Sequence, residues 1–221
     1  MSDSYFDHAH RMSRREFVKV TSAAAAGTML MSWLPKRTGA AVEKYPHWGE
    51  VVVIRNDAAT DGPNIRADVV QTMLDEAIQE LTNTSSVTEA WSHLLPGWRK
   101  DHVIAIKVNA IVKEIPTHPE VVDAIIAQLT EMGVPENNII VYDRRYPPGG
   151  GDGLSVVGYS YNTGPVGVRC FETDEQGWGY DWDHPIDILG QKRALSTILT
   201  RCDHLINVPV LRYIWTNTGL R

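Results

Sequence analysis

Cysteine is scarce in this sequence, and its scarcity excludes several kinds of site. The chain has 221 residues and two cysteines, Cys170 and Cys202. They are too far apart for a Cys-x-x-Cys motif and too few for a four-cysteine cluster, so we expect no iron–sulfur cluster from this chain alone. A disulfide between them and a pair of free thiols both remain open at this stage.

Long apolar runs are also missing. The apolar stretch at residues 20–34 is interrupted by hydroxyl residues and glycine, and it is shorter than the roughly twenty residues that span a bilayer. A permanent membrane anchor is therefore not expected. Three sequence motifs are absent as well: no G-x-S-x-G, G-x-G-x-x-G or P-loop pattern stands between a predicted strand and helix, so hydrolase, dinucleotide and P-loop readings lose their support.

Positive charge is in deficit. The sequence has 21 Lys and Arg against 27 Asp and Glu, a net charge of −6. The first 41 residues hold six of the basic and three of the acidic residues, so the remainder lies near −9. An acidic surface repels a phosphate backbone, which makes nucleic acid a poor candidate partner.

What the sequence does contain begins with an arginine pair. Arg14 and Arg15 stand in the segment SRREFVK at residues 13–19, ahead of the short apolar stretch and a small-residue exit near Ala41. This pattern resembles the twin-arginine translocation signal, which directs folded proteins across the bacterial inner membrane. We predict a signal peptide at residues 1–41, recognition by the twin-arginine translocase, and a periplasmic location. A cytoplasmic protein with a chance basic N-terminus is the alternative.

After Ala41 the chain alternates apolar, β-branched runs with amphipathic runs, which is typical of strands joined by helices. Predicted strands are 51–54, 103–108, 139–142 and 204–208, and predicted helices are 65–81, 119–132 and 186–201. The Pro- and Gly-rich segment 145–152 is predicted as a loop, and residues 156–161 and 166–171 as the two arms of a hairpin excursion. This order predicts a single α/β domain over residues 42–221, with three α/β/α layers around a mainly parallel sheet.

Four of these segments carry a family resemblance. They are IAIKVN (104–109), THPEVV (117–122), IVYDR (140–144) and LINVPVL (205–211), with a Gly133-Val134 turn before the third. Together they resemble the domain of unknown function 362 family over roughly residues 50–211. The resemblance implies an α/β domain, often exported by the twin-arginine route and sometimes fused to a ferredoxin-like cluster domain, and it implies no established reaction.

The end of the chain departs from that pattern. The resemblance implies further α/β structure after Leu211, whereas ten residues follow here. We therefore expect a domain truncated at its C-terminus, with the last strand poorly covered. An inactive fragment is one alternative for the function.

Ligands of open parallel sheets bind beyond the carboxyl ends of the strands. Polar residues at or just beyond the ends of predicted strands are Asn56 and Asp57, Lys107 and Asn109, Asp143, Arg144 and Arg145, and Asn207 and Arg212. Cationic side chains in this place suit a carboxylate or phosphate, so a small anionic ligand is predicted, with Asn109, Arg144, Arg145 and Asn207 as its binding residues. The three glycines at 149–151 could present N–H groups to the same anion, or form a plain flexible loop.

Lys107, Asp143 and His118 are the candidate catalytic residues. A lysine in a buried strand could serve as a base, Schiff-base former or anchor, and Lys107→Met is expected to abolish anion binding at a stability change of about 1 kcal/mol. The alternative is a strand-end lysine that reaches water or pairs with Asp143. His118 is a possible general base or a capping residue of the helix at Pro119. Asp181, Asp183 and His184 are adjacent in an irregular segment and seldom share one centre, so no metal site is expected.

Two functional classes stay open. The first is an exported enzyme acting on a small anionic substrate beside Lys107, Asn109 and Asp143. The second is a non-catalytic accessory or binding protein for a redox partner. The cofactor, if any, is unknown.

Overall fold

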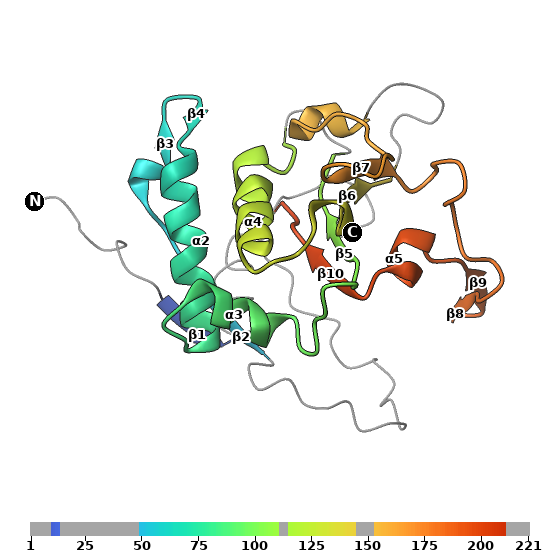
Figure 1. The fold of residues 1–221 in the computed structure, drawn as a ribbon, viewed down its shortest axis with the longest axis horizontal. Coiled ribbons are helices and arrows are strands. Elements are labelled where there is room, and N and C mark those ends of the chain that lie inside the picture. Colours follow the sequence, from blue (N-terminus) through green and yellow to red (C-terminus); the bar gives the residue numbers. More distant parts are fainter. Residues whose placement is uncertain (1–9, 14–48, 111–114, 145–152, 211–221) are drawn as a thin grey trace, which may run out of the picture. The chain divides into compact units, whose positions relative to one another are not determined.

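The computed structural model (Figure 1) describes residues 10–13, 49–110, 115–144 and 153–210. The arginine pair, the glycine run, Arg145 and Arg212 lie outside these ranges. The chain divides into two compact units, with the boundary after Leu94, and each is described by itself. Among the described residues, no helix is both long and apolar enough to cross a membrane.

The first unit is built around one amphipathic helix. Strands β1 (His10–Ser13) and β2 (Glu50–Val53) form an antiparallel pair, and β3 (Thr60–Asp61) and β4 (Asn64–Ile65) form a short hairpin after the 3₁₀ helix η1 (Asp57–Ala59). Helix α2 (Ala67–Thr82) follows, then α3 (Val87–Leu94). The predicted helix at 65–81 is thus confirmed. β1 falls within the predicted signal peptide, so on that prediction its pairing with β2 belongs to the precursor.

The predicted first strand forms, but it is not part of the parallel sheet. β2 pairs antiparallel with β1, and the four-stranded sheet contains only strands of the second unit. Asn56 caps η1 by accepting the Ala58 N–H, and Asp57 pairs with Arg55 at 3.3 Å. Because β2 is not a strand of the main sheet, the expectation that these two residues follow one of its strands was wrong.

The second unit contains a four-stranded parallel sheet in the order β10-β5-β6-β7. Its strands are β5 (Ile104–Lys107), β6 (Ile139–Asp143), β7 (Arg169–Glu172) and β10 (His204–Asn207). β5 and β6 are central, and every residue of β6 is buried. Continuous apolar runs form such strands because helices cover both faces of a parallel sheet. The predicted α/β fold is confirmed.

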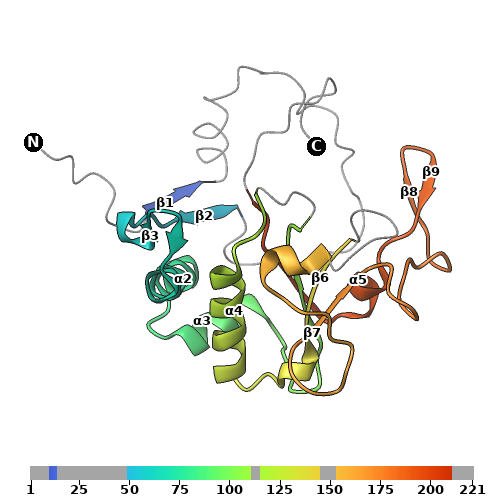
Figure 2. The ribbon, with the colours of Figure 1, turned by 90° about the horizontal axis from the view of Figure 1, so that it is seen from above.

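Helices α4 (Pro119–Glu131) and α5 (Thr197–Arg201) lie on opposite sides of this sheet (Figure 2). Pro119 opens α4, where its missing N–H costs nothing, and Gly133, at φ +101°, follows the helix end. On the α5 side, Ile198 packs with Ala105, Ile140 and Phe171 in a buried cluster. Ser196 starts α5 by accepting the Ile198 N–H.

The predicted hairpin of 156–161 with 166–171 was wrong. Leu154 and Val157 are buried on one side of the 3₁₀ helix η3 (Gly153–Val157), because residues three apart share a face in such a helix. β7 instead joins the sheet parallel to β6. One antiparallel bridge, between Asn162 and Cys170, remains of the expected pairing.

The predicted helix at 186–201 was wrong over its first half. Residues there form an exposed hairpin of β8 (Ile186–Ile188) and β9 (Gln191–Arg193). Leu189 and Gly190 have φ of 52° and 78°, which is the backbone of a two-residue hairpin turn. A helix cannot pass through two left-handed residues, so it begins only after Ser196.

Cys170 and Cys202 are not joined by a disulfide, which decides between the two alternatives that the sequence left open. Cys202 packs against the cluster on the α5 side of the sheet. Cys170 precedes Phe171, a member of that cluster, so along β7 its side chain points to the other face. The sheet separates the two sulfur atoms.

Candidate functional site

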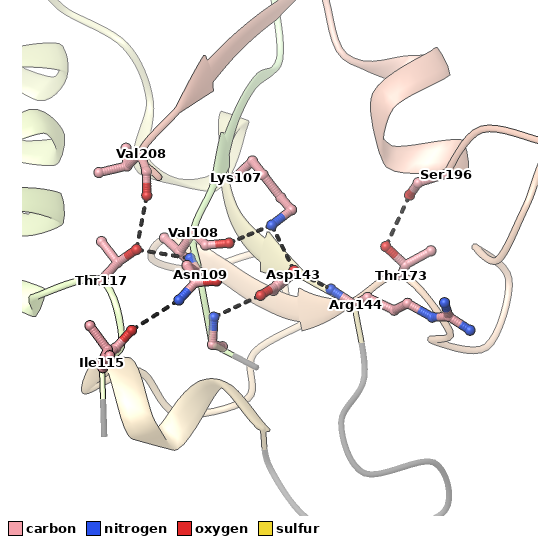
Figure 3. A network of polar contacts seen from close by, with 11 residues as sticks. Lys107, Val108, Asn109, Ile115, Thr117, Asp143, Arg144, Thr173, Ser196 and Val208 are labelled. Carbon is pink, nitrogen blue, oxygen red and sulfur yellow. Dashed lines mark hydrogen bonds and ion pairs between the residues drawn. The ribbon is translucent and has the colours of Figure 1, made fainter. Parts of the chain in front are cut away.

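Lys107 ends β5 at the carboxyl edge of the sheet, and its ammonium group is held from two sides (Figure 3). Nζ lies 2.7 Å from Asp143 Oδ1 and donates to the Val108 carbonyl oxygen at 2.5 Å. About a third of the side chain, 34 %, is exposed. An ammonium has three N–H donors, so among the described residues one donor of Lys107 is left for water or a ligand.

Asp143, at the end of β6, is the buried partner, with 2 % of its side chain exposed. Oδ1 also accepts the Arg144 N–H at 2.7 Å, and Oδ2 accepts the Ala110 N–H at 2.7 Å. The carboxylate therefore receives three short, charge-assisted hydrogen bonds. It ties together the chain leaving β5 and the chain leaving β6, and its oxygens are occupied by these donors.

Thr117 closes the loop that leaves β5. Its buried hydroxyl accepts the Asn109 N–H at 2.8 Å and donates to the Val208 carbonyl oxygen at 2.9 Å. Asn109 donates its side-chain amide to the Ile115 carbonyl oxygen at 3.0 Å. These bonds join the ends of β5 and β10 and fix the start of α4. One of the two amide N–H donors of Asn109 is thus used within the loop.

The remaining predicted site residues lie around this network in different ways. Asn207 is exposed and stands in register with Lys107 on the neighbouring strand. Arg144 is exposed, and its guanidinium extends away from the Lys107–Asp143 pair (Figure 3). His118 is exposed at the residue before α4, with no side-chain cap bond, and it takes no part in the network. Arg145 lies outside the described residues.

A second polar pair stands beside Asp143. The Thr173 N–H donates to the Asp143 carbonyl oxygen at 3.0 Å, and the Thr173 and Ser196 hydroxyls are 3.2 Å apart. Nearby, burial raises the pKa of the Tyr180 hydroxyl, and the charge of Asp174 adds to this while that of Arg144 opposes it. These groups link the ends of β6 and β7 to the start of α5.

Sequence reasoning found the lysine, the carboxylate and the two asparagines but missed the groups that hold them. Thr117, Thr173 and Ser196 are not among the predicted site residues. The one signal for Thr117 was its place two residues before the helix-starting Pro119. Nothing local to the sequence indicates that the peptide N–H groups of Ala110 and Arg144 both point at Asp143.

The arrangement presents one partly exposed ammonium donor, an exposed amide beside it, and a carboxylate that already accepts three hydrogen bonds. That set can donate hydrogen bonds to a bound oxyanion. In the described part of the chain, no group of three His, Cys, Asp or Glu side chains is placed to hold a metal ion.

Comparison with known proteins gives one match. A family model described as Domain of unknown function (DUF362) matches residues 104–214, a range that begins at β5 and includes every described residue of the Lys107 network. No curated protein and no solved structure matches the chain.

Proposed function

The chain belongs to the family described as Domain of unknown function (DUF362), and on this premise we propose that its parallel-sheet unit binds a small anionic ligand at the carboxyl edge, with the Lys107 ammonium as the main contact. The observation that carries the proposal is the geometry of Lys107. Its side chain is pinned by Asp143 and Val108 yet remains 34 % exposed, with one N–H donor unassigned among the described residues.

The fixed position of the Lys107 ammonium favours a role in ligand binding over a purely structural ion pair with Asp143. A free surface lysine loses the mobility of a long side chain when it binds a ligand, whereas two bonds already fix Lys107. The negative charge of Asp143 is shared among Lys107 and two peptide N–H groups, so it only partly offsets the ammonium.

The charge of a carboxylate or phosphate is complementary to that of the Lys107 ammonium. One oxygen would accept from Lys107, and the side-chain amide of Asn207, in register on β10, would donate to a second oxygen. The burial of Asp143 and its three hydrogen bonds favour a positioning role for this residue over that of a general base. The proposal is thus a binding site first, and an enzyme acting on the same anion remains compatible with it.

We also propose that the protein is exported to the periplasm through the twin-arginine route. The support is the order of features at residues 13–41: the arginine pair, the short apolar stretch and the small residues at its end.

Thermal denaturation with added anions tests the binding proposal. Inorganic phosphate, acetate and succinate are compared with chloride at equal ionic strength, using wild type, Lys107→Gln and Lys100→Gln. Lys100 is exposed at the opposite end of β5 and serves as the matched control. Ligand that binds only the native state raises the midpoint with concentration. We expect this rise in wild type and Lys100→Gln, and its loss in Lys107→Gln; equal responses in all three proteins would contradict the proposal.

A further inference from the structure

Two histidines meet at the amino edge of the sheet, away from the Lys107 network. His102 lies two residues before β5, and His204 is the first residue of β10. Each follows an aspartate, Asp101 or Asp203. Because β10 and β5 are parallel and in register from His204 opposite Ile104, the two Asp-His pairs come side by side.

The two imidazoles are joined by a hydrogen bond. His102 Nδ1 is 3.1 Å from His204 Nε2, and the ring centroids are 5.3 Å apart with an interplanar angle of 42°. The distance between the centroids matches the sum of the N···N distance and the distance from each ring centroid to its own nitrogen, as expected when both centroids and both nitrogens lie on one line. The N···N line therefore runs outward from both rings, along the direction of an N–H bond on one and a lone pair on the other. Such a bond needs at least one of these two nitrogens to be unprotonated.

This bond is part of what attaches β10 to the sheet. Among the described residues β10 is an edge strand with β5 as its neighbour. At the amino end, Asp203 Oδ2 accepts the Val103 N–H at 2.8 Å, and the His204 N–H donates to the Val103 carbonyl oxygen at 3.2 Å. The histidine pair adds the side-chain contact between the same two segments.

The surroundings of the histidine pair both lower and raise the pKa of His204. Burial lowers the pKa of His204, and the charge of His102 lowers it further, while the carboxylate of Asp203 opposes both. Asp101, beside His102, is ion-paired to Arg99 at 3.2 Å, which holds the pKa of that carboxyl below its usual value. Lys100 stands in the same segment and is exposed. The carboxylate of Asp203 is thus the main group that stabilises the positive charge of a first proton on the histidine pair. The short N···N distance opposes the binding of a second proton.

We propose that the His102–His204 pair is a proton-sensitive clamp on β10, closed while the two rings hold at most one added proton and opened when both are cationic. The second proton comes from solvent and occupies the nitrogen lone pair that accepts the hydrogen bond. Two N–H donors then face each other between like charges. Acidification accordingly loosens the amino end of β10, a regulatory property that does not depend on the anion site.

The sign follows from proton linkage. A histidine whose pKa is lower in the folded state stays neutral there while the unfolded chain, with a pKa near about 6.5, takes up a proton. The closed state is therefore favoured above the pKa of the unfolded chain. This stabilisation of the closed state is lost as the pH falls through the lower pKa of the folded state. For one proton, the equilibrium between closed and open shifts by at most about tenfold per pH unit.

Native-state hydrogen exchange tests the clamp on the intact protein. The amide N–H of His204 is followed from about pH 7.5 to about pH 5, with the intrinsic exchange rate divided out. Wild type, His102→Gln and His184→Gln are compared. Glutamine is neutral at every pH in this range and can still accept a hydrogen bond. His184, an exposed histidine two residues before β8, is the matched control.

We expect the opening equilibrium of wild type and His184→Gln to rise with acidification, and that of His102→Gln to change less than threefold over about two pH units. A wild-type pH profile in His102→Gln would overturn the clamp. So would a profile that changes when EDTA is added, since a metal ion and not a proton would then join the rings. If His102→Gln fails to fold, ¹⁵N shifts of the wild-type imidazoles decide: joint protonation of both rings with unchanged exchange overturns the proposal.

Discussion

Removing either partner of the Lys107–Asp143 pair should destabilise the protein, and removing both should cost less than the two single losses added together. In Asp143→Asn, one carboxylate oxygen becomes an NH₂ group, so at least one of the three donors at 2.7 Å faces another donor. An unsatisfied buried N–H costs about 1–3 kcal/mol, and the bonds that remain are to a neutral oxygen and weaker. We expect a loss of about 3 kcal/mol.

Lys107→Met leaves a carboxylate that is 2 % exposed without its counter-charge. Breaking a fully buried pair costs about 3–5 kcal/mol. The cost here is lower because Lys107 is one-third exposed and two peptide N–H groups still bind the carboxylate, so we expect about 2 kcal/mol. This exceeds the value of about 1 kcal/mol derived from the sequence, which assumed an uncompensated lysine.

In the Asp143→Asn background, no charge is stranded by the loss of Lys107, so Lys107→Met should cost only about 0.5 kcal/mol. The coupling energy is then about 1.5 kcal/mol by a double-mutant cycle in urea. The exposed pair Arg99–Asp101 is the control, with Arg99→Gln and Asp101→Asn expected to couple by under about 0.5 kcal/mol. Equal costs of Lys107→Met in both backgrounds would refute the reasoning.

Three further predictions concern other parts of the chain. Burial raises the pKa of Tyr142 to about 12, with smaller contributions from the charges of Cys202 and Asp143. Because the phenol of the unfolded chain ionises first, the free energy of unfolding should fall between about pH 10 and about pH 12. In Tyr142→Phe the denaturation midpoint should fall less across that range, and an unchanged slope would be evidence against the assignment. Leu189 is 99 % exposed at φ 52°, so Leu189→Asn, which creates an Asn-Gly turn, should gain about 0.5 kcal/mol in urea denaturation, whereas a loss would mean that the side chain is needed. Replacing Arg14 and Arg15 by Lys should leave the precursor in the cytoplasm by cell fractionation, and continued export in a strain without the twin-arginine machinery would show that the signal is misread.

The core of the second unit could be predicted because its signals are local. β5 and β6 are short apolar runs buried on both faces, and the start of α4 is marked by Pro119. β7 could not be predicted in the same way. It is a four-residue strand with Arg169 at one end, and its place depends on the tertiary pairing with β6. A sequence window cannot distinguish that pairing from a hairpin.

Some residues of the candidate site could be predicted from local signals, and others could not because they depend on distant parts of the chain. Lys107 lies near the end of one predicted strand and Asp143 follows another. The carboxyl ends of adjacent parallel strands meet at one edge, so their proximity could be predicted. Thr117 could not, because its hydroxyl bonds to Val208, 91 residues later in the chain. The hairpin at Leu189 was misread because helical spacing of apolar residues outweighed the turn signal of Gly190.

Direct observation of the Lys107 ammonium tests the central claim. The ¹⁵N and ¹H signals of the lysine Nζ groups are followed by NMR while inorganic phosphate or succinate is added at constant ionic strength. Ligand concentrations up to about 10 mM detect a dissociation constant of about 1 mM, which corresponds to a binding free energy of about −4.1 kcal/mol. The account predicts a saturable shift of the Lys107 signal, with the exposed Lys100 moving little. A Lys107 signal that stays still, or that drifts in parallel with Lys100, would contradict anion binding at this site.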